Sequence, residues 1–226
     1  MAKIKFGMMM TDASGKLGGH VFSKNRGGSY VRTKVTPSNP QSSAQMTVRG
    51  IFASISSGWS SLTESARNSY RNFVSDYAKT DIFGDLRNPS GKSLYQRLNQ
   101  NLAISDQPLL AQCVAPSEVP FANLVSAIGS LALSELEIVT AGETTGAKVV
   151  VWATPSLSQG KKFVKNSLRQ ISVVNGSNAL ETNVFADYVA KFGAPIAGAN
   201  VYIGVRVINA NGQASPLEVV KATINA

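Results

Sequence analysis

The chain has 226 residues, of which 43% are hydrophobic and 15% charged, and its formal net charge is +9. This length can hold one large domain or two small ones, each with enough core to fold. No apolar run approaches the roughly 20 residues that a membrane-crossing helix needs, and the first residues lack the pattern of a signal peptide. We therefore expect no membrane partner. A single cysteine, Cys113, excludes an internal disulfide and is typical of a reducing compartment.

The positive charge is concentrated at the start of the chain. Residues 1–50 contain eight basic side chains and one acidic side chain, whereas residues 106–226 contain eight of each. Clustered positive charge attracts phosphate backbones or acidic protein surfaces. The alternative interpretation is an N-terminal segment that is solvated and loosely ordered.

Residues 1–36 predict an extended basic arm that contains a β-hairpin. Residues 20–24 and 29–35 alternate as strands do, and Asn25-Arg26-Gly27-Gly28 between them is a typical hairpin connection. A hairpin alone is marginally stable in water, so we expect its open edge to pair with a partner sheet. The side chains expected to make this assembly contact are basic or aromatic: Lys24, Arg26, Tyr30, Arg32 and Lys34.

Residues 37–105 predict a small body of three helices. The first helix can begin at Asn39-Pro40 or at a capping box that starts with Ser42, and Gly58 suits its C-terminal end. Thr63 is expected to cap the second helix. Apolar side chains recur at helical spacing in all three segments, and this pattern predicts core positions. The residues expected in this core include Val48, Ile51, Phe52, Ile55, Ala66, Tyr70, Phe73, Val74, Tyr77, Leu94, Tyr95, Leu98 and Leu102.

Motifs for catalysis and nucleotide binding are weak or absent in this sequence. Residues 90–93, Ser-Gly-Lys-Ser, match the end of a phosphate-binding P-loop, but position 86 is Leu86 where that motif requires glycine. His20 is the only histidine and Cys113 the only cysteine, which nearly excludes the common nucleophile–base pairs and a cluster of metal ligands. We expect no enzyme activity, no cofactor, no metal and no small-molecule substrate.

After a predicted linker at residues 106–118, residues 119–226 predict an antiparallel β-sandwich. Strand-like alternation replaces helical spacing, and turn signals such as Asn211-Gly212 separate the segments. Residues 185–192 fit either a helical turn or a bridging strand. With the arm and the helices, this half gives an α+β fold class. The expected strands are residues 131–140, 147–154, 169–174, 199–208 and 217–224.

The end of the chain resembles the final hairpin of a fibronectin type III or other immunoglobulin-like domain. The resemblance covers residues 201–224 and rests on Tyr202, Val205, Val207, the Asn211-Gly212 turn and Ser215-Pro216. It implies that the predicted sandwich has an immunoglobulin-like topology. The sequence departs from the family in one respect, because Trp152 lies one strand later than the tryptophan of these domains.

The first half, about residues 15–102, resembles virion-associated proteins of tailed bacteriophages and prophages. These proteins combine a Gly-rich basic opening with an Asn-Pro/Gln/Arg motif, a Trp-x-x-Leu-Thr motif and a Ser/Thr-Gly before a helix. The resemblance implies a structural component of the particle. Here the matching residues are Gly27-Gly28, Arg32, Asn39-Pro40, Ser42, Gln45, Arg49, Trp59, Leu62-Thr63, Arg67, Tyr70 and Ser90-Gly91.

We therefore predict a virion protein that acts as a head–tail connector, a tail component or a capsid-associated protein. Its expected partners are other virion proteins and copies of itself in a ring or lattice. Two alternatives stay open. A nucleic-acid-binding protein would place the arm cations on phosphates and stack bases on Tyr30 and Phe22. A host-surface-binding module would use loops of the C-terminal half, including Trp152.

Overall fold

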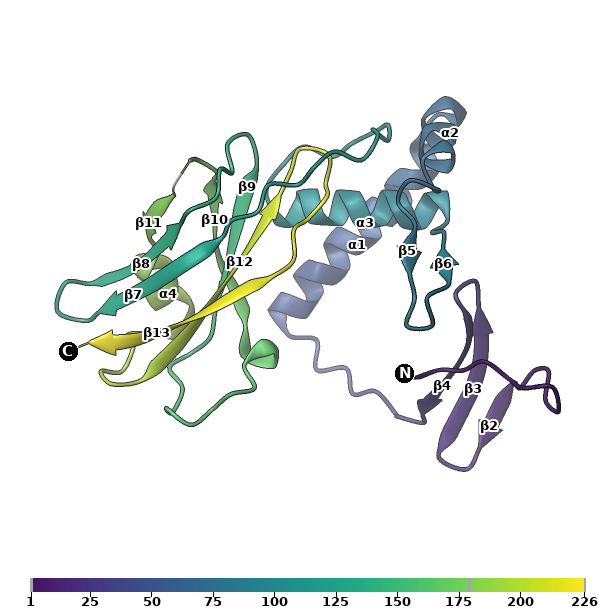
Figure 1. The fold of residues 1–226 in the computed structure, drawn as a ribbon, viewed down its shortest axis with the longest axis horizontal. Coiled ribbons are helices and arrows are strands. Elements are labelled where there is room, and N and C mark those ends of the chain that lie inside the picture. Colours follow the sequence, from purple (N-terminus) through teal and green to yellow (C-terminus); the bar gives the residue numbers. More distant parts are fainter. Residues whose placement is uncertain (1, 179, 226) are drawn as a thin grey trace.

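The computed structural model describes residues 2–178 and 180–225. In these residues the protein has a mixed α+β fold, with four α-helices, one large curled sheet of seven strands and two smaller sheets. Figure 1 shows the small N-terminal sheet at one end, the helices in the middle and the large sheet at the other end.

The arm is a four-stranded antiparallel sheet in the order β1-β4-β3-β2. The predicted hairpin is present as its central pair, in which Asn25 pairs with Gly28 across the turn. The side-chain Oδ1 of Asn25 accepts a hydrogen bond from the backbone N–H of Gly27 at 2.8 Å, which fixes the turn. The strands are β1 (Ala2–Lys3), β2 (Gly15–Leu17), β3 (His20–Asn25) and β4 (Gly28–Thr33).

The helical body contains three helices and one short hairpin. The side chains of Ser42, Thr63 and Ser90 each accept a hydrogen bond from the backbone N–H three residues later and so cap the three helices. Thr63 caps its helix as predicted, and of the two predicted starts of the first helix the structure has Ser42 and not Asn39-Pro40. The hairpin between the second and third helices was not predicted. The elements are α1 (Ser43–Ser61), α2 (Glu64–Asn72), β5 (Lys79–Thr80), β6 (Leu86–Arg87) and α3 (Gly91–Ile104).

Helix α1 does not end at Gly58, as the sequence analysis expected, but continues to Ser61. A Cβ atom at position 58 would lie 2.9 Å from the hydroxyl oxygen of Tyr95, so glycine is needed here for helix packing and not for a cap. Tyr95 belongs to a cluster of three aromatic rings with Trp59 and Tyr70, whose centroids lie 5.2–6.0 Å apart. Such tilted and edge-to-face contacts stabilise the core beyond its buried area.

The segment after α3, predicted as a linker, packs against the helices. The side-chain hydroxyl of Tyr70 donates to the carbonyl of Leu110 at 2.8 Å, and the N–H of Leu110 donates to Oδ1 of Asn99 at 2.7 Å. Cys113 is buried, and its N–H donates to the hydroxyl of Ser69 at 2.9 Å. These bonds connect the segment to α2 and α3.

The large sheet has the strand order β10-β9-β12-β13-β7-β8-β11. All neighbours are antiparallel except β13 and β7, which run parallel. The five predicted strands are present, while β7 and β11 were missed. Helix α4 resolves the ambiguous segment as a helix. The elements are β7 (Leu124–Ser130), β8 (Glu135–Thr140), β9 (Lys148–Ala153), β10 (Arg169–Asn175), β11 (Glu181–Asn183), α4 (Phe185–Phe192), β12 (Asn200–Ile208) and β13 (Glu218–Asn225).

Strand β13 joins the two halves of this sheet. It pairs with β12 along residues 218–223 and with β7 at Ile224 and Asn225, so the strands form one continuous sheet and not two separate ones. The sheet curls around a single core to which Tyr188 of α4 also contributes. The fully buried side chains of this core include Leu136, Ile138, Val149, Val151, Val201, Ile203, Val205 and Val207.

The end of α3 lies against the large sheet and its β12–β13 turn. Asn101 Nδ2 donates to the carbonyl of Gly212 in this turn at 2.8 Å. Gly212 has φ +75°, and a Cβ atom there would lie 2.5 Å from the carbonyl oxygen of Leu98. Both the backbone conformation and the close approach therefore require glycine. Gln170 of β10 donates to the carbonyl of Ile104 at 3.1 Å, a second contact to the end of α3.

Candidate assembly surface

The five predicted contact residues lie on the central hairpin of the arm sheet and just beyond it (Figure 1). Lys24 is near the end of β3, Arg26 lies in the turn, and Tyr30 and Arg32 lie on β4. Lys34 follows β4 directly. Tyr30 is half-buried, and the four cations are exposed.

The strand register divides these residues between two faces of the arm sheet. Because side chains alternate along a strand, Tyr30 and Arg32 share one face of β4. Residues that pair directly across two strands lie on the same face, so Val21, the partner of Arg32, is on that face too. Lys24, paired with Ser29, lies on the opposite face. The structure thus brings Tyr30 and Arg32 together and separates Lys24 from them.

Three of the four predicted cations are free to contact a partner. Lys24 forms an ion pair with Asp12, with 3.0 Å between Nζ and Oδ2. Within residues 2–178 and 180–225, Arg26, Arg32 and Lys34 form no ion pair. Their exposed charges can therefore make charge-assisted contacts with acidic groups without first breaking a pair in this chain.

Ion pairs between the arm and the β5–β6 hairpin dock the arm on the helical body. Lys3 Nζ lies 3.0 Å from Asp81 Oδ2, and Lys5 Nζ lies 2.9 Å from Asp85 Oδ2. Arg87 contacts both carboxylates from β6, at 3.3 and 3.5 Å. The sequence analysis missed this cluster because its lysines and aspartates are more than seventy residues apart. The only signal was the acidic character of residues 81–85 in a basic half of the chain.

Asp81 is the central acceptor of this docking cluster. Its side chain is only 4% exposed. The hydrogen bond from Lys3 is the largest cause that holds the pKa of Asp81 well below its usual value, and bonds from two backbone N–H groups and Arg87 act in the same direction. The carboxylate is therefore the ionised acceptor of the docking cluster at neutral pH.

The arm sheet has two edge strands, the two-residue β1 and the longer β2, and one strongly exposed loop. Within the described residues, β2 pairs only with β3, so its outer edge presents unpaired backbone groups. The loop that joins β1 to β2 carries Met8 and Met9, and both side chains are fully exposed. Methionine side chains adapt to irregular partner surfaces.

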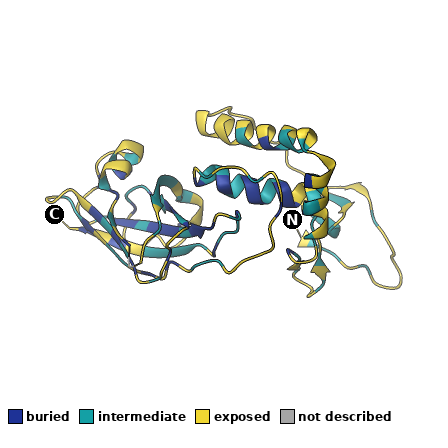
Figure 2. Ribbon diagram, turned by 90° about the horizontal axis from the view of Figure 1, so that it is seen from above, coloured by how far each residue is buried: buried dark blue, intermediate teal, exposed yellow. Residues whose placement is uncertain are grey.

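The N-terminal half of α1 is a second exposed apolar surface, and it corrects the sequence analysis. Val48 and Phe52 were expected in the core, but they are 56% and 47% exposed. They lie on the same apolar face of α1 as Ile55 and Trp59, which pack in the helical core. Figure 2 shows most of α1 in the colour of exposed residues. The apolar face of α1 therefore extends beyond the part of the helix that packs in the core.

Metal binding and thiol chemistry have little support in the described residues. In residues 2–178 and 180–225 no group of three or more His, Cys, Asp or Glu side chains could hold a metal ion. Burial raises the pKa of the Cys113 thiol to about 11, so this thiol is an unreactive core group at neutral pH. The helices of the described residues are all too short or too polar to cross a membrane.

No protein-family model matches the chain, and no curated protein matches it. The class of the protein must therefore be inferred from its fold and its surfaces. The protein has a mixed α+β fold in which a small basic sheet is docked on a helical body through ion pairs. An open strand edge and exposed apolar side chains accompany this charge. These features are typical of a protein that assembles with other chains.

Proposed function

We propose that this chain is a structural component of a tailed-bacteriophage virion, placed at the neck, in the tail or on the capsid. The observation that carries the proposal is the arm sheet, which is held to its own body through ion pairs while its remaining cations and its open edge face outward. In this role the arm joins the subunit to neighbouring copies or to another virion protein in a ring or lattice.

The docked arm is suited to exchange between subunits. Residues 34–42 connect it to α1 without a helix or strand, and all of them are exposed. A segment of this length spans up to about 30 Å when extended. The Lys5–Asp85 pair is exposed on both sides, and such pairs are individually weak and screened by salt, so a competing acidic partner can replace it. The Lys3–Asp81 pair, whose carboxylate is buried, is the contact that such an exchange must also break.

The exposed groups of the arm match what a neighbouring subunit must supply. The free edge of β2 can receive a strand of the partner, and the backbone hydrogen bonds between the two strands fix how they align. Arg26, Arg32 and Lys34 then pair with acidic groups beside that strand. Val48 and Phe52 on α1 provide apolar area that a second contact can bury.

We also propose that the curled sheet is related to immunoglobulin-like domains. Two features support this proposal: the strand order, with β10-β9-β12-β13 next to β7-β8-β11, and the parallel pairing of β13 with the first strand of the sheet. Trp152 lies on β9, the third strand, and is half-buried. Such domains serve as interaction modules in many assemblies.

Nucleic-acid binding remains the second candidate, and one observation favours it. Tyr30 and Arg32 share a face of the arm sheet, where an aromatic ring and a guanidinium could stack a base and contact its phosphate. The charge on this face is limited to a few cations, which favours protein contacts over a nucleic-acid groove.

Incorporation into particles tests the proposal. We expect the triple substitution Arg26→Ala, Arg32→Ala and Lys34→Ala to lower occupancy in purified particles, with the largest difference from the native chain at low salt, because higher salt already screens these charge contacts in the native chain. A chain that lacks residues 1–36 should fold but remain absent from particles. The matched control removes three exposed cations of the large-sheet domain: Lys161, Lys162 and Lys165.

The outcomes separate the proposed functions. Full occupancy without the arm would refute the arm as the assembly contact. Normal occupancy of the triple variant together with lost binding to DNA would assign the cations to nucleic acid. Equal losses in the triple variant and in the lysine control would mean that only total charge matters.

A further inference from the structure

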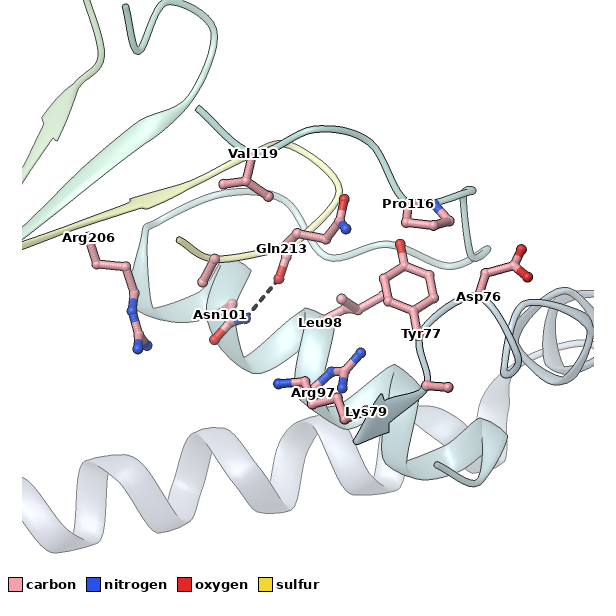
Figure 3. A pocket seen from close by; sticks show the side chains of 13 residues that line it. Asp76, Tyr77, Lys79, Arg97, Leu98, Asn101, Pro116, Val119, Arg206 and Gln213 are labelled. Atoms are coloured by element: carbon pink, nitrogen blue, oxygen red, sulfur yellow. Dashed lines mark hydrogen bonds between the residues drawn. The ribbon is translucent and has the colours of Figure 1, made fainter. Parts of the chain in front are cut away.

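A concave pocket lies where the helical body meets the large sheet, far along the chain from the arm. It has a volume of about 420 Å³, within the range of about 300–1,000 Å³ typical of ligand sites. Its walls come from the segment before β5, from α3, from the segment before β7 and from the β12–β13 turn (Figure 3). The contact of Gly212 with α3 fixes the turn that closes one side.

Three cations line this pocket against a single acid. The cations are Lys79 of β5, Arg97 of α3 and Arg206 of β12, and Asp76 is the only carboxylate among the lining residues. In the described part of the chain, none of the three cations forms an ion pair. The Nε atom of Arg206 is buried and has no hydrogen-bond partner there. Leaving a buried donor without a partner is costly, so an acceptor that reaches Arg206 would be bound favourably.

Arg97 is held in place for an incoming anion. Its guanidinium lies 5.5 Å from the centre of the Tyr77 ring, a contact that orients it without using its N–H donors. The Tyr77 hydroxyl is itself occupied, because it donates to the carbonyl of Val114 at 3.0 Å. Burial lowers the pKa of Arg97, but an arginine stays protonated at neutral pH. The site therefore holds a partly desolvated positive charge.

The remaining lining defines the class of anion. Leu98, Pro116 and Val119 add apolar surface beside the cations. A free inorganic anion gains no binding energy from this apolar wall, and a DNA duplex is too broad to enter a concave pocket. A glutamate or aspartate side chain next to an apolar residue satisfies both parts of the lining. Guanidinium groups bind such carboxylates through paired hydrogen bonds.

We propose that this pocket binds an acidic segment of a partner protein, with a carboxylate held by Arg97 and Arg206. The inference goes beyond the proposed function and does not depend on it, because the pocket and the arm are separate surfaces. Asn101 Nδ2 and Gln213 Oε1 are already bonded within the chain, which leaves Asn101 Oδ1 as an acceptor and Gln213 Nε2 as a donor for the backbone of the segment. The pocket thus adds a second, sequence-selective contact to the protein.

Binding of a short fluorescein-labelled peptide of alternating Glu and Leu, followed by anisotropy, tests the inference on the full chain. We expect the same peptide with Gln in place of Glu to have an affinity at least about tenfold lower. Arg97→Gln and Arg206→Gln should each weaken binding of the Glu peptide by about tenfold, and Arg97→Lys should restore part of it. Arg49→Gln, which removes an exposed arginine of α1, is the matched control and should bind as the native chain does.

Hydrogen exchange on the unsubstituted protein locates the peptide even if a variant fails to fold. Added peptide should protect residues 95–101 and 206–214. Protection of residues 20–34 instead would place the peptide on the arm, which would overturn this inference while leaving the proposed function intact. Equal binding of the Glu and Gln peptides, or competition by a single-stranded DNA oligonucleotide that is lost in Arg97→Gln, would also overturn it.

Discussion

Replacing Asn99 by alanine should destabilise the protein and release the segment that follows α3. Asn99 is fully buried, and its Nδ2 donates to the carbonyls of Tyr95 and Leu110 at 3.1 and 3.3 Å. Its Oδ1 accepts from the N–H of Leu110 at 2.7 Å. Alanine leaves that N–H without its acceptor, at a cost of about 1–3 kcal/mol, and loses further bonds worth about 1 kcal/mol each. We expect the free energy of unfolding to fall by about 3 kcal/mol.

Urea denaturation followed by tryptophan fluorescence measures this loss, provided that the slope with denaturant is unchanged. Gln100→Ala is the matched control, because the neighbouring side chain forms no side-chain hydrogen bond within the described residues, and its effect should stay within about 0.5 kcal/mol. Faster hydrogen exchange at Leu110 should accompany the loss in Asn99→Ala. A loss below about 1 kcal/mol with unchanged exchange at Leu110 would refute the reasoning.

Two further predictions concern the arm and α1. Asp81→Asn should speed hydrogen exchange in residues 2–33, and unchanged protection would show that other contacts hold the arm. Because the folded pKa of Asp81 is depressed, its contribution to docking is present above the unfolded value near 3.8 and is lost as the pH falls below it, which exchange measured from neutral to acidic pH can follow. Gly50→Ala, where an added Cβ meets nothing within 4 Å, should stabilise α1 by about 0.5–1 kcal/mol. Gly58→Ala should give no such gain because of Tyr95, and equal thermal unfolding shifts for both variants would contradict this packing.

Local signals predicted the three helices of the body, the arm hairpin and five strands of the large sheet, but they left α4 undecided and missed β7 and β11. Ser42, Thr63 and Ser90 begin their helices because a hydroxyl before a helical segment can satisfy a free N–H wherever that segment lies in the fold. Gly58 shows the limit of such signals. A glycine that ends a helix and a glycine that lets two helices approach are identical in sequence, and only the position of Tyr95 decides between them.

The surfaces were harder to predict than the elements. Val48 and Phe52 have the spacing of core residues, but whether a stripe is covered depends on how far the neighbouring helices extend. The docking cluster of Lys3 with Asp81 depends on a contact across 78 residues, and no local pattern indicates it. The pocket at Arg97 and Arg206 likewise combines residues of α3 and β12 that only the packing of the two halves brings together.

The parallel pairing of β13 with β7 also has a consequence for the order of events during synthesis. Every residue of the helical body precedes β7, so its core can form while the later strands are still being made. The two halves of the large sheet cannot close until Ile224 has left the ribosome and reached Gly129. Until then β7 and β12 have unpaired edges, and such edges favour aggregation. We expect nascent chains stalled before β13 to need chaperones, although their helical part is already native.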